Sequence, residues 1–63
     1  MPNPPLGKRL LWARKLRGIR QNVAARILGV HPAQLCRWEK GERGVPVRHV
    51  EAAEAFIAER EER

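Results

Sequence analysis

The chain has 63 residues, 43% of them hydrophobic and 32% charged, and a net charge of +6. A chain of this length forms one small globular domain, residues 1–63. Its single cysteine excludes a disulfide within the chain. It has neither a secretory signal nor an apolar run long enough to span a bilayer, so we expect a cytoplasmic protein.

The residue types that most enzymes use are missing. The sequence has no Ser, Thr, Tyr or Asp, so it offers no hydroxyl nucleophile. His31, Cys36 and His49 do not have the spacing of a structural zinc site, and no glycine-rich phosphate loop is present. We therefore expect no enzymatic activity, no metal and no cofactor.

Charge is distributed unevenly along the chain. Residues 1–48 carry eleven Lys or Arg and two Glu, a balance of +9, whereas residues 49–63 carry two Arg and five Glu, a balance of −3. A basic body with an acidic end predicts a surface that binds a polyanion, with the last helix turned away from it. The simpler alternative is a soluble protein that is merely rich in arginine.

Three prolines predict an extended arm over residues 1–5, and a first helix follows over residues 5–17. Gly18 ends this helix, and Ile19 is expected to pack into the core before the second helix. The inward positions of the first helix, read from the helical spacing, are Leu6, Leu10, Ala13 and either Leu16 or Arg17.

The second helix is predicted over residues 21–28, with Gly29 after it in a left-handed turn. Pro32 opens a third helix over residues 32–40, with His31 as its N-cap and Gly41 as its stop. Two helices joined by such a short turn are typical of a helix-turn-helix, which presents its second helix to the major groove of DNA.

A fourth helix is predicted over residues 46–61, and residues 60–63 are expected to fray. The fold class is therefore all-α, a compact four-helix domain with room for a fifth short turn. The inward stripe of the fourth helix is expected to consist of Val47, Val50, Ala53, Phe56 and Ile57.

The third helix has one face for the core and one for DNA. At about 100° per residue, Leu35 and Trp38 mark the core side. Arg37, on the other side, can bind guanine O6 and N7, and Pro32 and Ala33 can pack on a thymine methyl. The alternatives are a solvated Arg37 and a spectator role for the cysteine. The predicted base-facing residues are Pro32, Ala33, Gln34, Cys36 and Arg37.

Phosphate contacts hold such a domain on the duplex without reading its sequence. The start of the second helix and the loop after the third helix are well placed to make them. Each residue taken alone could equally be a solvated surface residue. The candidates are Arg20, Gln21, Asn22, Lys40 and Arg43.

Several segments in register resemble the lambda-repressor/Cro-type (XRE-like) helix-turn-helix family, over about residues 10–56. They are Ala13-Arg14, Gln21, Ala24-Ala25, Leu28-Gly29-Val30 and Glu39-Lys40-Gly41. The resemblance implies an ion pair between Arg14 and Glu39, a phosphate contact at Gln21 and base-facing roles for Pro32, Ala33 and Arg37. Residues 38–53 are also similar to the prophage-associated YdaS-like branch.

The sequence departs from the family pattern in two places. Polar residues that usually open the third helix are replaced by residues 31–33, His-Pro-Ala, so base reading depends heavily on Arg37 and on DNA shape. Positions that are usually polar carry Trp12, Val23 and Ile27, together with Leu11. These residues either enlarge the core or form an exposed patch; partial burial around Trp12 is the favoured alternative.

The prediction is a sequence-specific regulator of double-stranded DNA, a Cro-like repressor of a phage or prophage in a bacterial host cell. It is expected to bind as a homodimer, at least on DNA, through the fourth helix with Phe56, Ile57 and the tail. One alternative is the antitoxin of a toxin–antitoxin pair, holding a partner protein through Trp12, Val23 and Ile27. Another is an RNA-binding or adaptor module on the same scaffold.

Overall fold

The computed structural model describes residues 5–61, which form four helices and no strand. They are α1 (Leu6–Leu16), α2 (Gln21–Leu28), α3 (Pro32–Lys40) and α4 (Val47–Glu61). The all-α, four-helix fold class is confirmed, and these residues contain no fifth helix. The predicted arm, apart from Pro5, and the last two residues of the predicted frayed end lie outside the described residues.

The helix ends follow the sequence signals closely. α2 and α3 have the predicted bounds, α1 is one residue shorter at each end, and α4 begins one residue later. Gly29 and Gly41 end α2 and α3 with φ of 75° and 80°, a left-handed conformation that other residues adopt only at a cost. Glycine at these two places fixes the length of both helices of the helix-turn-helix.

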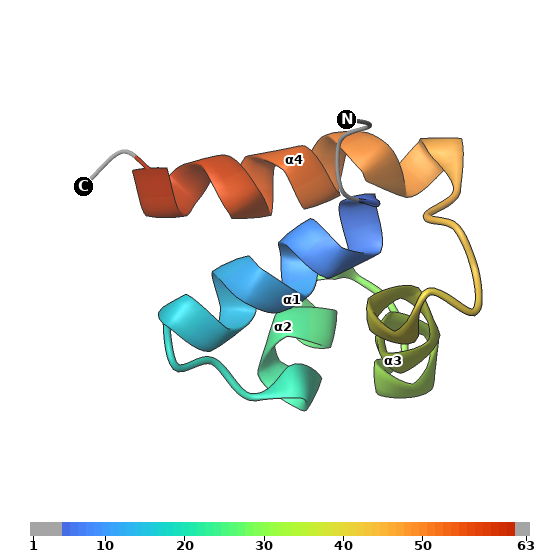
Figure 1. Cartoon of the computed structure of the whole chain (residues 1–63), viewed down its shortest axis with the longest axis horizontal. Helices are drawn as coiled ribbons and strands as arrows, with labels where there is room; N and C mark the ends of the chain where they lie inside the picture. Colours follow the sequence, from blue (N-terminus) through green and yellow to red (C-terminus); the bar gives the residue numbers. More distant parts are fainter. Residues whose placement is uncertain (1–4, 62–63) are drawn as a thin grey trace.

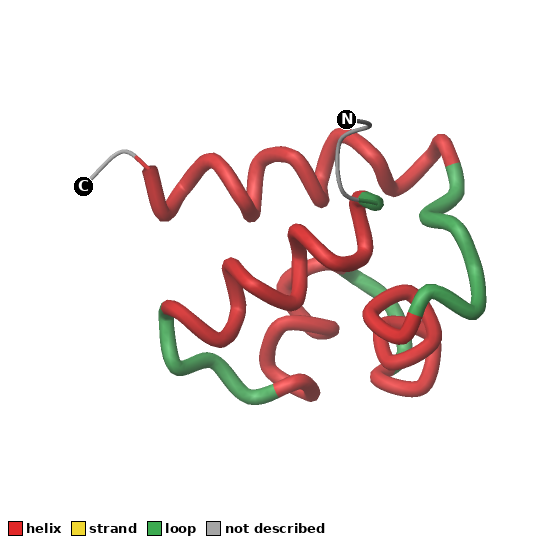
Figure 2. The backbone as a smooth tube through the Cα atoms, viewed as in Figure 1, coloured by secondary structure: helices red, strands yellow, loops and turns green. Residues whose placement is uncertain are grey.

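The helices pack as a bundle in which α1 is central. Figure 1 shows α4 along one edge of the molecule, α1 beside it, and α2 and α3 on the other side of α1. α1 and α2 each pack against both α3 and α4. The longest connection, residues 41–46, carries the chain from α3 to α4 (Figure 2). α4, with its glutamates Glu51, Glu54 and Glu59, therefore lies across α1 from α3.

The core collects apolar side chains from all four helices. Ala24 and Ala25 are fully covered, and such small side chains let neighbouring helices approach closely. Ile19 packs against the edge of this core, as predicted. The buried apolar residues are Leu10, Ala13, Ala24, Ala25, Leu28, Leu35, Trp38, Ala53, Phe56 and Ile57.

The predicted inward position of Val47 is wrong, because this side chain is 90% exposed. At about 100° per residue, Val47 lies about 120° from Ala53 around the helix. Ala53 is fully buried, so Val47 falls beside the buried stripe of α4 and not on it. Helix periodicity alone was sufficient to see this.

Of the two residues predicted as alternatives for the inward position at the end of α1, Leu16 and Arg17, it is Arg17 that faces α4. Its guanidinium lies 4.6 Å from the centroid of the Phe56 ring, which is a cation–π contact. Arg17 Nη1 donates to the Phe56 carbonyl at 3.3 Å, and Nη2 lies 3.1 Å from Glu59 Oε1. Leu16 is left 68% exposed. Arg17 therefore connects the end of α1 to α4, and Leu16 does not.

Candidate nucleic-acid interface

α3 begins with a side-chain cap. His31 Nδ1 accepts a hydrogen bond from the Ala33 backbone N–H at 3.1 Å, and Pro32 occupies the first helical position. The proline has no N–H and its fixed φ suits a helix start, so one orphan donor disappears and another is satisfied. The predicted capping role of His31 is confirmed.

The two faces of α3 differ sharply in burial. Leu35 and Trp38 are each 1% exposed, so Trp38 is a core residue and not a base-stacking platform. Ala33 and Arg37 are exposed on the opposite face, while Pro32, Gln34 and Cys36 are half-buried at its edges. Arg37 has no hydrogen-bond or ion-pair partner within the part of the chain that the structure describes. The guanidinium is thus available for a ligand.

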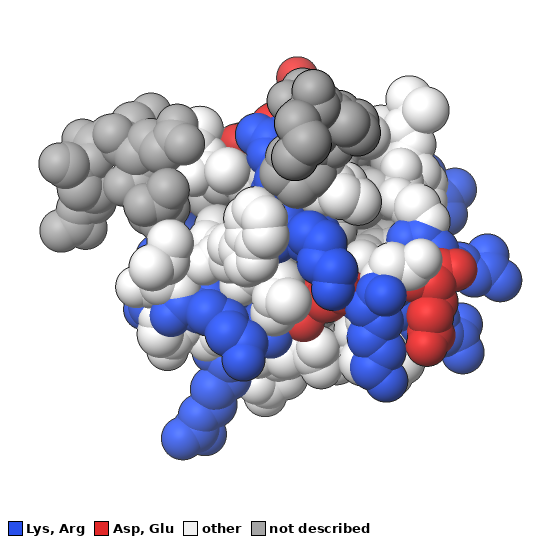
Figure 3. Space-filling view, viewed as in Figure 1, with Lys and Arg blue, Asp and Glu red and all other residues white. Residues whose placement is uncertain are grey.

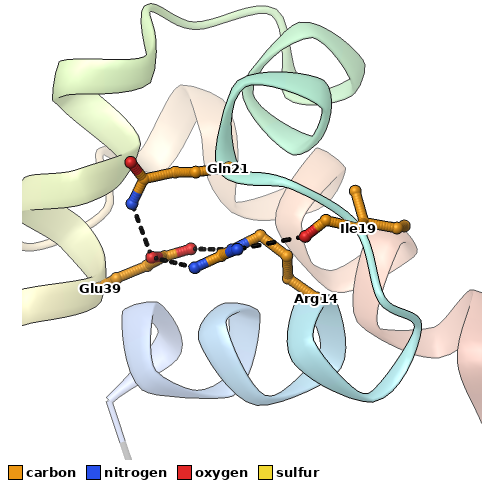
Figure 4. Close-up of polar contacts among 4 residues, drawn as sticks. All are labelled: Arg14, Ile19, Gln21 and Glu39. Carbon is orange, nitrogen blue, oxygen red and sulfur yellow. Dashed lines mark hydrogen bonds and ion pairs between the residues drawn. The ribbon is translucent and has the colours of Figure 1, made fainter.

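A buried carboxylate ties α3 to α1. Arg14 Nε lies 2.7 Å from Glu39 Oε2, and Arg14 Nη2 donates to Glu39 Oε1 at 2.9 Å. Their side chains are 13% and 5% exposed. Arg14 Nη1 also donates to the Ile19 carbonyl at 3.1 Å, so the guanidinium holds the α1–α2 loop as well (Figure 4). The expected ion pair is present, with the two-pronged geometry that suits arginine.

Gln21 joins the same carboxylate from α2. Its Nε2 donates to Glu39 Oε1 at 2.9 Å, so one carboxylate receives hydrogen bonds from α1 and from α2 (Figure 4). An amide nitrogen has two N–H donors, and the second remains free for another acceptor. The bond to Glu39 was not foreseen. It fixes the direction of the Gln21 amide at the first residue of α2, where backbone N–H groups also lack helical partners.

The candidate phosphate-binding residues flank α3 at the ends of neighbouring segments. Arg20, Asn22, Lys40 and Arg43 are exposed, and Gln21 is half-buried. Figure 3 shows Lys and Arg side chains gathered over α3 and over the loop between α1 and α2. No carboxylate occurs in residues 5–38, so the first two helices add only positive charge to this side. Such a field attracts a polyanion.

One close approach between helices was missed by the sequence reasoning. A Cβ built on Gly7 would overlap the backbone carbonyl of Trp38, so α1 and α3 touch through their main chains at this point. Gly7 precedes Arg14 by seven residues and therefore shares its side of α1. A glycine within a helix, on the side of a predicted interhelical ion pair, was the signal for this contact.

Three further findings bear on other classes of site. Within residues 5–61, no helix has both the length and the apolar content needed to cross a membrane. In this same stretch no group of three or more His, Cys, Asp or Glu could hold a metal ion. Cys36 is a free, half-buried cysteine.

Comparison with protein families agrees with the geometry of α2, the turn and α3. A helix-turn-helix family matches residues 10–59, most of the chain. The chain belongs to the lambda-repressor-like helix-turn-helix family. It is a DNA-binding transcription regulator, and its ligand is double-stranded DNA. Searches of curated proteins and of solved structures returned no match.

Two expectations about the surface of this helix-turn-helix protein are corrected. Trp12 retains 53% exposure and lies outside the core, because it is about 160° around α1 from Arg14, which faces α3. Val23 and Ile27, on α2, are 39% and 55% exposed. The proposed dimer surface fails for Phe56 and Ile57, which are 3% and 7% exposed within the core of one copy.

Proposed function

We propose that the protein is a Cro-like repressor of phage or prophage origin, acting in the cytoplasm of a bacterial host cell. It would occupy an operator by inserting α3 into the major groove and so block access to a promoter. The observation that carries the proposal is the exposed face of α3. The Arg37 side chain stands there without a hydrogen-bond or ion-pair partner among the described residues, while the opposite face is anchored by Leu35 and Trp38.

Base reading would then rest mainly on one long side chain. Arg37 has the donor geometry for guanine O6 and N7, the commonest specific contact in the major groove. Pro32 and Ala33 offer apolar surface for a thymine methyl, and Gln34 and Cys36 border the same face. With so few polar groups at the helix start, DNA shape would supply the rest of the specificity.

Phosphate contacts would set the register of α3. Arg20, Gln21 and Asn22 lie at the start of α2, and Lys40 and Arg43 follow the reading face. One copy offers few such contacts, so specific binding would require two copies on a pseudo-palindrome, with half-sites about 34 Å apart. The pairing of copies would be completed on the DNA, because Phe56 and Ile57 are used inside each copy.

Selection of bound duplexes from a random pool tests this proposal directly. We expect an enriched site with two symmetric halves about one helical turn apart. In anisotropy titrations, Arg37→Ala should lose about 1–3 kcal/mol of specific binding and relax the preference at one base pair per half-site. The matched control is Lys40→Ala, which should weaken all duplexes evenly and reduce the salt slope by about 1 per copy.

The results of these two experiments distinguish between the alternative functions of the protein. Unchanged operator selectivity in Arg37→Ala would remove Arg37 as the reader residue. A pool that shows no enriched sequence would remove the repressor proposal and favour an RNA-binding or adaptor role for the same scaffold.

The exposure of Trp12, Val23 and Ile27 favours a second candidate, an antitoxin that binds DNA through α3 and a toxin through these exposed apolar side chains. Coexpression with the product of the adjacent gene tests it. A complex of fixed stoichiometry that dissociates on substitution of Ile27 by Asp would support the antitoxin. A homodimer or monomer that elutes alone would leave the simple repressor.

A further inference from the structure

The outward side of α1 carries two large apolar side chains between two lysines. Trp12 is 53% exposed and Leu16 is 68% exposed. Lys8 lies one turn before Trp12, and Lys15 and Leu16 lie three and four residues after it, so each of these three residues is a helical neighbour of Trp12. We name these four residues, Lys8, Trp12, Lys15 and Leu16, the outer strip. At a rise of 1.5 Å per residue the strip is about 12 Å long, or about two helical turns.

The outer strip faces away from α3. Arg14 points from α1 to Glu39 of α3, with Nε 2.7 Å from the carboxylate. Trp12 and Leu16 are each two residues from Arg14, which places them about 160° from it around the helix. A duplex bound along the exposed face of α3 therefore leaves the outer strip uncovered.

The strip is cationic and has no carboxylate of its own. Residues 5–38 contain no Asp or Glu, and neither Lys8 nor Lys15 has an ion-pair partner within the described residues. Two carboxylates of α4 are already paired: Glu54 with Arg9 of α1, and Glu59 with Arg17, the residue after α1. The uncompensated charge of the strip is therefore positive.

We infer that the outer strip is a docking site for a partner protein. The segment of the partner that binds there is an acidic helix or extended stretch that also carries apolar residues. Trp12 and Leu16 would fill the apolar contacts, and Lys8 and Lys15 would pair with flanking carboxylates. A tryptophan that becomes buried on binding often contributes a large share of the binding free energy of an interface. The claim that this partner binds while α3 holds DNA rests on the proposed function, whereas the docking site itself does not.

The chemistry of the strip distinguishes this occupant from duplex DNA, whose bases are stacked within the helix and do not reach an exposed tryptophan. Phosphates match lysine side chains but gain nothing from a tryptophan and a leucine on the same two turns. A segment that carries both carboxylates and apolar residues matches the lysines of the strip as well as its tryptophan and leucine. Attraction between the opposite charges also raises the rate of association and makes it depend on salt.

Selection from a displayed library of random 16-residue peptides tests the inference, with the folded full chain as the bait. We expect the enriched peptides to combine an excess of Asp and Glu with one or more large apolar residues. Binding of a synthetic peptide from this set should weaken about tenfold or more in Trp12→Ala, the anchor variant. Lys15→Glu should weaken it by a similar factor and reduce its salt dependence, because only Lys8 of the strip then attracts the acidic peptide.

The matched controls are Val47→Ala and Arg48→Glu, which change an exposed apolar residue and an exposed cationic residue of α4. Both controls should bind the peptide as the unsubstituted chain does. Circular dichroism checks that each variant is folded. Lys15→Glu keeps the test decisive if Trp12→Ala unfolds, because Lys15 is exposed and outside the core.

Three outcomes would overturn the inference. They are a library without enriched peptides, enriched peptides without excess acidic residues, and equal peptide binding by the strip variants and the α4 variants. Loss of duplex DNA affinity or of self-association in the strip variants, with no peptide bound, would assign the strip to DNA or to a second copy. Measuring operator binding as well as peptide binding separates the two proposals. Arg37→Ala should impair only operator binding, and Trp12→Ala should impair only peptide binding.

Discussion

α1 is held on two sides by the same chemistry in two different settings. Toward α3, Arg14 and Glu39 form a pair whose side chains are 13% and 5% exposed. Toward α4, Arg9 and Glu54 form a pair at 3.2 Å whose side chains are 37% and 50% exposed. The buried pair gains further hydrogen bonds from Gln21 and to the Ile19 carbonyl, whereas the side chains of the exposed pair bond only to each other within residues 5–61.

The two pairs differ in how far they fix the arrangement of the helices and in how much they contribute to the free energy of unfolding. A buried pair must offset the loss of hydration of two charges, and it does so only when nearly every donor and acceptor is satisfied. The pair therefore specifies one arrangement of α1, α2 and α3 and contributes little net free energy. An exposed pair loses little hydration and gains little, so it tolerates many arrangements. The side of α1 toward α3 is thus the rigid one.

The largest expected effect comes from removing one partner of the buried pair. Arg14→Ala leaves the Glu39 carboxylate buried with only Gln21 as a side-chain donor, and should lower the free energy of unfolding by about 3–5 kcal/mol. Total stability is roughly 3–9 kcal/mol for 63 residues. Urea denaturation followed by circular dichroism measures the loss. A midpoint equal to that of the unsubstituted chain would show that the pair is not coupled to folding.

A double substitution, Arg14→Met with Glu39→Leu, sharpens the same contrast. Removing both charges should restore most of the stability, because no buried charge remains unpaired. Operator affinity should stay reduced, since the Gln21 amide loses the acceptor that directs it. Full recovery of both stability and affinity would mean that the pair has no part in orientation.

A smaller effect is expected from closing the space at Gly7. Gly7→Ala should lower the unfolding free energy by about 1–3 kcal/mol, because the new methyl overlaps the Trp38 carbonyl and α1 must move off α3. The better helix propensity of alanine offsets part of this loss. Gly44→Ala is the matched control, since a Cβ there meets nothing within 4 Å. Equal melting temperatures for the two variants would contradict the close approach.

The smallest effect belongs to the exposed pair. Arg9→Ala should change the unfolding free energy by at most about 1 kcal/mol, and the change should shrink further in high salt. Thermal melts at low and high ionic strength measure both. A loss as large as that of Arg14→Ala would end the distinction between the two sides of α1.

The fold could be predicted almost entirely from local signals. Proline at the start and glycine at the end set the bounds of α3, and helical spacing identified Leu35, Trp38 and Ala53 as core residues. The Arg14–Glu39 pair could be expected only through family resemblance, because residues 25 apart in the sequence have no local pattern that joins them.

What escaped prediction depends on contacts between helices. The exposure of Trp12 and Leu16 follows from the absence of a described helix over that side of α1, and periodicity does not report what covers a face. The bond from Gln21 to Glu39 depends on the distance between α2 and α3. Base and phosphate contacts remain predictions, since they require the position of the DNA.

The hydrogen-bonded carboxylate of Glu39 has a consequence for the ease with which this regulator can be retargeted. The contacts that hold α3 in place include those of its buried side chains, Leu35, Trp38 and Glu39. The exposed side chains at Ala33 and Arg37 take no part in them. Under the proposed function, in which Ala33 and Arg37 face the bases, substitutions at these two positions would change the operator preference and leave the buried contacts of α3 unchanged.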